Sequence, residues 1–153
     1  MKIIALQGKS NIGKTTTLKQ MILTIVNNDF FNLEDCYNKE KIIRRCNMDK
    51  GDVMCVFDCN GVKIGITTRG DTSGCLGEDY LKHFRNCDIV VCAVHTYGGT
   101  VNFIKEKGAD EVVIHAKWYV EANDRKIIDC VNLIQSNVLI KEVKRLANER
   151  EIK

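Results

Sequence analysis

The most constraining feature of the sequence is an eight-residue stretch near its start, Gly8-Lys9-Ser10-Asn11-Ile12-Gly13-Lys14-Thr15. It fits the pattern G-x-x-x-x-G-K-[ST], in which a Gly-rich loop holds phosphate groups. The apolar run before it, residues 2–7, predicts a buried strand. After it, Leu18, Ile22 and Ile25 share one face of a predicted helix. Strand, loop and helix in this order are the context that the pattern requires.

Each position of this stretch has a physical role in holding phosphate. The glycines allow successive backbone N–H groups to point at one anion, and the start of the following helix adds its positive dipole end. Lys14 supplies a cation for the β- and γ-phosphates, and the Thr15 hydroxyl is a ligand for Mg²⁺. The residues predicted to contact a nucleotide here are Gly8, Lys9, Ser10, Asn11, Ile12, Gly13, Lys14, Thr15 and Thr16. The alternative is a Gly-rich turn that binds nothing.

Length and charge narrow the classes of protein. The 153 residues predict one domain, spanning 1–153, and the formal net charge of +3 is too small to indicate a nucleic-acid partner. No apolar run approaches the length of a membrane span or a signal peptide. Eight cysteines without a secretion signal indicate reduced thiols, so we expect a cytoplasmic protein without a membrane partner.

The middle of the chain contains a strong hairpin signal. Residues 53–57 are apolar, residues 62–67 alternate, and Asn60-Gly61 lies between them. The preceding residues 30–52 are polar and weakly periodic, which predicts either a short helix or a solvated connector.

The second half alternates between helical and strand patterns. We predict helices over residues 78–86, 101–107 and 123–148, with Gly108 as a C-cap, and strands over residues 88–94 and 111–116. In the last helix the predicted apolar face carries Ile127, Val131, Ile134 and Val138, and then Leu139, Val143 and Leu146.

This alternation predicts an α/β fold with a mostly parallel sheet, one antiparallel hairpin strand at the edge and helices on both faces. Ligands of such sheets bind beyond the carboxyl ends of the parallel strands. We therefore expect four loops on the ligand side, namely residues 8–15, 68–74, 95–100 and 117–122. The Asp58–Gly61 turn is expected at the opposite end.

The order of elements up to about Asp124 resembles the core of the small GTPase-like branch of P-loop NTPases, which implies a three-layer P-loop NTPase fold. The first motif is similar to G-R-S-N-V-G-K-S of ribosome-associated GTPases. It also resembles G-K-G-G-V-G-K-T-T-T, the deviant P-loop of partitioning ATPases, although Ser10-Asn11 replaces two glycines. The second resemblance implies that Lys9 reaches the nucleotide of a second subunit.

The chain departs from the GTPase pattern where a carboxylate normally helps to hold Mg²⁺. D-x-x-G is expected after the second hairpin strand, but the chain has Thr67-Thr68-Arg69-Gly70. Asp71 is the nearest substitute, and we predict Lys14, Asp71 and Arg69 as catalytic residues, with Thr15 on the metal. If the hairpin is wrong, Asp58 takes the acidic role instead.

The base-recognition pattern N-K-x-D is also changed, to His115-Ala116-Lys117-Trp118. The acid that would pair with guanine is missing, so we expect ATP rather than GTP. Lys117 and Trp118 are predicted to sandwich the base, the alternative for Trp118 being a plug at the sheet edge. His95 ends a strand on the expected ligand side, where it could orient water or substrate, or be structural.

Three functions are compatible with these residues. The first is a slow Mg²⁺-dependent ATPase that acts as a switch, alone or with a protein partner or a second copy of the chain. The second is a small-molecule or nucleotide kinase, against which the scattered arginines count. The third is a nucleotide-binding module without turnover, favoured by the missing carboxylate at residue 67.

Overall fold

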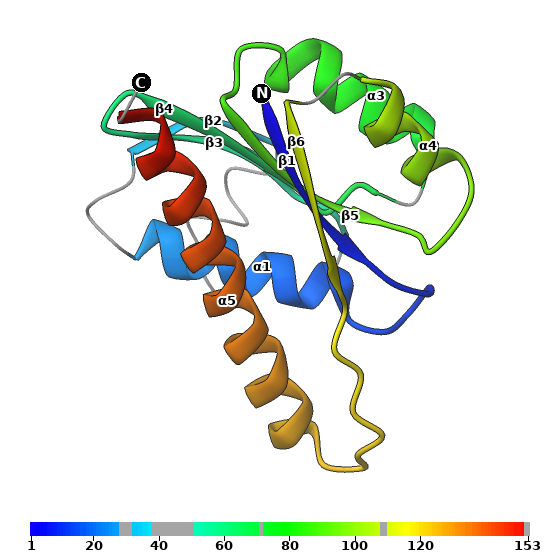
Figure 1. The fold of residues 1–153 in the computed structure, drawn as a ribbon. Coiled ribbons are helices and arrows are strands. Elements are labelled where there is room, and N and C mark those ends of the chain that lie inside the picture. Colours follow the sequence, from blue (N-terminus) through cyan, green and yellow to red (C-terminus); the bar gives the residue numbers. More distant parts are fainter. Residues whose placement is uncertain (28–31, 38–50, 71, 108–109, 152–153) are drawn as a thin grey trace.

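The computed structural model describes residues 1–27, 32–37, 51–70, 72–107 and 110–151. A six-stranded sheet in the order β2-β3-β4-β5-β1-β6 forms its centre (Figure 1). The strands are β1 Lys2–Gln7, β2 Asn32–Tyr37, β3 Met54–Cys59, β4 Val62–Thr67, β5 Ile89–Val94 and β6 Glu111–Ala116. The helices are α1 Lys14–Val26, α3 Ser73–Asp79 with a π-helical continuation η1 Tyr80–Phe84, α4 Gly99–Glu106 and α5 Arg125–Glu151.

Four neighbouring strands are parallel, and this confirms the main expectation for the sheet. β4 pairs with β5, β5 with β1, and β1 with β6, all in parallel register. Their carboxyl ends therefore lie at the same end of the sheet. The loops that follow β1, β4, β5 and β6 all start there. Because β5 lies between β1 and β4, the loop after β5 is the nearer neighbour of the β1–α1 connection.

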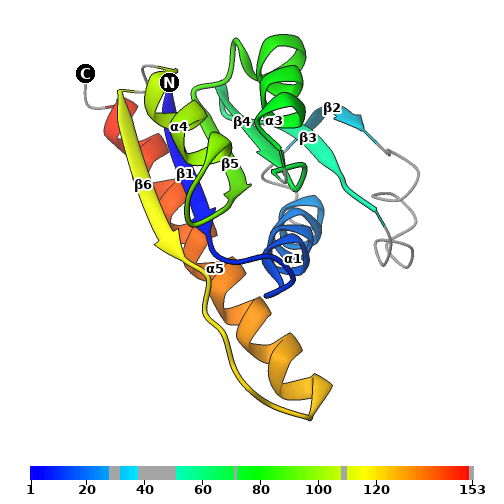
Figure 2. The same ribbon diagram turned by 90° about the vertical axis from the view of Figure 1, so that its right-hand side faces the viewer.

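Helices cover both faces of the sheet, so the fold has three layers (Figures 1 and 2). On one face α1 and α5 pack against a core that includes Ile4, Leu18 and Val91. On the other face α3, η1 and α4 cover a second core, which includes Ala5, Phe84 and Val94. β1 and β5 contribute to both cores because alternate side chains point to opposite faces.

The predicted hairpin is confirmed. β3 and β4 pair antiparallel, and Asn60 and Gly61 both have positive φ, of 52° and 83°, as the tight turn requires. The Asp58 carboxylate accepts a 2.8 Å hydrogen bond from Gly61 N, which closes the turn. Since β4 is parallel to β1, the start of β4 and Asp58 lie at the edge opposite the β1–α1 connection. The alternative role of Asp58 as the metal-site acid is therefore wrong.

The edge of the sheet differs from the prediction. β3 is an interior strand, antiparallel to both β2 and β4, and β2 forms the edge. Residues 32–37 form a strand, whereas the sequence predicts a short helix or a connector there. Their polar sequence carries no strand signal, and the backbone of β3 supplies the pairing, with a bulge between Leu33 and Asp35. Residues 38–50 of the predicted connector lie outside the described residues.

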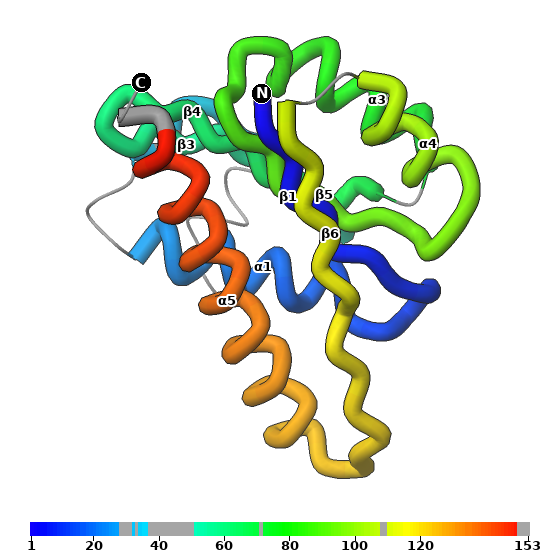
Figure 3. The backbone as a smooth tube through the Cα atoms, viewed as in Figure 1, coloured from blue at the N-terminus to red at the C-terminus, as the bar shows by residue number. Residues whose placement is uncertain are grey.

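Two further expectations about helices need correction. The helix predicted over 78–86 begins at Ser73, because the Thr72 side chain accepts a hydrogen bond from Cys75 N and caps it within the expected loop. The other correction is α5, which packs against α1 and whose first turns extend beyond the sheet (Figure 3). Ile127 and Ile134 are therefore half-exposed, whereas Leu139 and Val143 are buried. The predicted C-cap Gly108 lies outside the described residues.

Candidate functional site

The β1–α1 loop, residues 8–13, connects β1 to the first helix of the chain. Asn11 and Gly13 have positive φ, of 60° and 89°, so the chain curls before it enters α1. Gly8 is buried, and a Cβ at this position would lie 2.3 Å from Ile12 Cδ1 and 3.1 Å from Lys117 Cβ. Only glycine fits at residue 8 without displacing a neighbour.

Lys14 begins α1 and folds back over the loop. Its side chain is buried, at 7% exposure, and Nζ donates hydrogen bonds to Gly8 O at 2.8 Å and to Lys9 O at 2.6 Å. The ammonium group thus lies against the loop itself, and the N-terminus of α1 starts at the same residue. A cation, a curled backbone and a helix N-terminus together are the chemistry that binds phosphate.

A polar hollow of about 620 Å³ opens in front of this loop. The residues lining it come from the loop, from the start of α1 and from the end of β5; they are Ser10, Asn11, Gly13, Lys14, Thr15, Thr16, Ala93 and His95. His95 therefore lies beside the predicted phosphate site, as its position after β5 suggested. The side-chain amide of Gln7 donates to His95 O at 3.4 Å and to Thr96 O at 3.3 Å, which ties the end of β1 to this loop.

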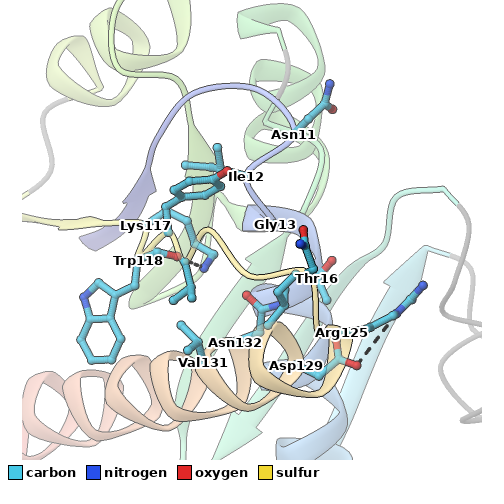
Figure 4. A pocket seen from close by; sticks show the side chains of 14 residues that line it. Asn11, Ile12, Gly13, Thr16, Lys117, Trp118, Arg125, Asp129, Val131 and Asn132 are labelled. Atoms are coloured by element: carbon cyan, nitrogen blue, oxygen red, sulfur yellow. Dashed lines mark hydrogen bonds and ion pairs between the residues drawn. The ribbon is translucent and has the colours of Figure 1, made fainter.

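A second pocket, of about 360 Å³, shares Asn11, Gly13 and Thr16 with the first (Figure 4). Its walls come from three parts of the chain: the β1–α1 loop with Thr16, the segment 117–123 after β6, and the first turns of α5. The α5 residues are Arg125, Ile128, Asp129, Val131 and Asn132. The two hollows are therefore adjacent and meet at the β1–α1 loop.

Lys117 and Trp118 both line the second pocket but differ in burial. Lys117 is 8% exposed, its backbone N–H donates to Gln7 O at 2.7 Å, and Nζ donates to Trp118 O at 2.5 Å. Burial lowers the pKa of the Lys117 ammonium group below its ordinary value. Trp118 is 46% exposed, so it is not buried as Lys117 is.

Residues of α5 hold this pocket together, and the sequence analysis did not identify them. The Gln135 side chain accepts a hydrogen bond from Trp118 N at 3.1 Å and donates to Ala116 O at 2.8 Å, which fixes the segment after β6. Asn132 is buried and accepts a hydrogen bond from Thr17 Oγ1 at 3.1 Å, which links α5 to α1 behind the loop. A polar residue that is buried on a helix is the signal that could identify Asn132 and Gln135. Thr17, the partner of Asn132, lies more than a hundred residues away in the sequence, so no local pattern connects the two.

The end of β4 and the loop after it form side-chain hydrogen bonds to α3 instead of lining a hollow. The Arg69 guanidinium donates to Asp79 Oδ1 at 2.6 Å and to Glu78 Oε2 at 3.1 Å, and Thr67 Oγ1 donates to Asp79 Oδ2 at 2.6 Å. Asp79 is fully buried, and burial raises the pKa of its carboxyl group above the ordinary value, against the opposing effects of Thr67 and Arg69. Arg69 and Thr67 do not line either hollow.

Asp71, the predicted substitute carboxylate, lies outside the described residues. Within the described ranges, which omit residue 71, no group of three or more His, Cys, Asp or Glu side chains could hold a metal ion. In the same ranges no helix is both long and apolar enough to cross a membrane. The Thr15 hydroxyl remains the metal-ligand candidate in the first hollow.

Comparison with protein-family models, with curated proteins and with solved structures gave no match to this chain.

Proposed function

We propose that the chain is a P-loop nucleoside-triphosphate-binding protein with a slow, Mg²⁺-dependent ATPase activity that serves as a switch. The observation that carries the proposal is the pair of adjoining hollows that share Asn11, Gly13 and Thr16. One is polar and contains Lys14 and Thr15, and the other contains Trp118. A nucleoside triphosphate fits this pair of hollows, with its phosphates in the polar one and its planar base in the one that contains Trp118.

In this proposal the β1–α1 loop and the start of α1 bind the phosphates. The Lys14 ammonium exchanges its hydrogen bonds with the carbonyls of Gly8 and Lys9 for phosphate oxygens, which gives a charge-assisted interaction. Thr15 offers its hydroxyl to Mg²⁺, an ion that prefers oxygen ligands and keeps several waters when carboxylates are few. The bound ion would neutralise phosphate charge.

The base belongs in the second pocket, against Trp118. The segment His115-Ala116-Lys117-Trp118 lacks the acid that would pair with guanine, and this favours ATP over GTP. Lys117 contributes through its buried stem, which lies so close to the loop that a Cβ at Gly8 would be 3.1 Å from Lys117 Cβ. A protein of this kind, with cysteines free among the described residues, fits a cytoplasmic location.

We expect slow turnover because the arginine proposed for catalysis is bonded to other side chains. Arg69 can stabilise transferring phosphate only after it leaves Asp79 and Glu78. Asp71, two residues further along the sequence, is the carboxylate that we assign to catalysis. Lys9 is exposed in the loop and is the residue that would reach the nucleotide of a second copy or protein partner. A non-hydrolysing module is the second candidate, because no carboxylate lines the first hollow among the described residues.

The test combines binding and turnover. Titration calorimetry with ATP and Mg²⁺ should show binding, stronger for ATP than for GTP, and phosphate release should proceed at about 10⁻³ s⁻¹ or slower. Asp71→Ala should lower this rate further, whereas Asp58→Ala, at the opposite edge, should leave it unchanged. Absence of binding by either nucleotide would refute the proposed function, and binding without measurable release would support the non-hydrolysing module.

A further inference from the structure

Asp129 is an acid in the second pocket that no sequence pattern placed there. It lies in the first turns of α5 and lines the pocket together with Thr16 and Trp118. Its side chain is 49% exposed, and Oδ2 lies 4.0 Å from Arg125 Nε, which is too long for a hydrogen bond. Asp129 therefore lines the pocket and has a long ion pair with Arg125, a residue that is 90% exposed, so its carboxylate can exchange this partner for a ligand.

The position of Asp129 within the pocket indicates which part of a nucleotide it meets. Thr16 lines both hollows and so marks the place where they join. Figure 4 shows Asp129 on the same side of the pocket as Thr16, with the Trp118 ring on the opposite side. A nucleotide with its phosphates in the first hollow has its sugar at the junction and its base farther away, toward Trp118.

We propose that Asp129 accepts hydrogen bonds from the ribose hydroxyls and thereby selects ribonucleotides over deoxyribonucleotides. This inference rests on the proposed nucleotide-binding function. An ionised carboxylate only accepts hydrogen bonds, and vicinal hydroxyls offer two donors at the spacing of its two oxygens. The same pairing of an acid with a ribose hydroxyl is used by dinucleotide-binding sites of α/β proteins.

The experiment measures the affinity of the full chain for ATP, 2′-deoxy-ATP and 3′-deoxy-ATP by titration calorimetry with Mg²⁺. The wild type should bind ATP about tenfold or more tightly than the analogue that lacks the contacted hydroxyl, which is the low end for a hydrogen bond to a charged group. The two analogues distinguish the 2′- from the 3′-hydroxyl. Asp129→Ala should reduce this ratio to near one.

A matched control removes a carboxylate of the same region. Glu121 is exposed on the segment after β6 and is not among the residues lining the pocket, so Glu121→Ala should keep the full preference for ATP. Thermal unfolding of both variants should remain close to that of the wild type, because neither side chain is buried.

The outcomes separate this inference from the proposed function. If the wild type binds ATP but binds both deoxy analogues equally well, or if Asp129→Ala keeps the preference, Asp129 does not contact the ribose, although the nucleotide site stands. If Asp129→Ala instead changes only the preference for ATP over purine riboside triphosphate, which lacks the amino group, Asp129 reads the base and the inference is wrong. If no triphosphate binds to the wild type, both proposals fail.

Discussion

The β1–α1 loop and the loop after β4 leave the same edge of the sheet, yet their polar groups have different partners. Lys14 donates to carbonyls of its own loop and lines an open hollow. Arg69 and Thr67 bond to Asp79, a fully buried carboxylate on the covering helix. A position at the carboxyl edge of a parallel sheet is therefore not enough to make a ligand contact. We infer that Lys14 can turn to a ligand by giving up bonds to loop carbonyls alone, whereas Arg69 must first break its bonds to Asp79 and Glu78.

Replacement of Lys14 is the largest expected effect and tests this contrast directly. Lys14→Ala removes charge-assisted hydrogen bonds worth roughly 1.5–3 kcal/mol, so the affinity for ATP should fall by about 10- to 150-fold. Arg69→Ala is the comparison variant: it leaves Asp79 buried without its cation and should mainly lower the free energy of unfolding. Calorimetric titration and denaturant unfolding of both proteins measure the two effects. An unchanged affinity of Lys14→Ala for ATP would refute the assignment of the β1–α1 loop as the phosphate site.

The close packing of Gly8 gives a second, smaller test, now of the shape of the β1–α1 loop. In Gly8→Ala the new methyl group overlaps Ile12 Cδ1 and crowds Lys117 Cβ, so the free energy of unfolding should decrease by about 1–3 kcal/mol. The measurement is urea denaturation.

Two matched variants sharpen the Gly8 experiment. The double variant Gly8→Ala with Ile12→Val lacks Cδ1 and should recover part of the loss. Gly74 lies in α3 with no atom closer than 3.8 Å to its Cβ position, so Gly74→Ala should stabilise the protein by about 0.5–1 kcal/mol. Equal losses from Gly8→Ala and Gly74→Ala would contradict the packing argument.

The smallest effect concerns the buried acid of the second loop and depends on pH. Folding raises the pKa of Asp79 above its ordinary value of 3.8, so the unfolded chain releases this proton at lower pH than the folded one. The contribution of Asp79 to stability is therefore fully present below 3.8 and is lost as pH rises through the raised value. Asp79→Asn cannot titrate. The wild type should lose stability relative to this variant as pH rises above 3.8, and a constant difference would contradict the assigned shift.

The sequence alone determined the features that depend on local chemistry. The strand Lys2–Gln7, the Asn60-Gly61 turn and the start of α1 follow from apolar runs, from residues that adopt positive φ and from helical periodicity, all of which act over a few residues. The Gly8–Thr15 pattern likewise predicted a loop between a strand and a helix, and the structure has this loop between Gln7 and Lys14.

Only the tertiary structure decided which distant residues complete the site. Residues 32–37 became an edge strand because β3 offered a pairing partner, and Asp129 and Asn132 entered the second pocket because α5 extends past the sheet beside α1. The position of β5 between β1 and β4 placed His95, rather than Arg69, in the first hollow. Strand order and helix placement follow from the summed burial of two cores on opposite faces of the sheet, a property of the whole chain that no short sequence pattern contains.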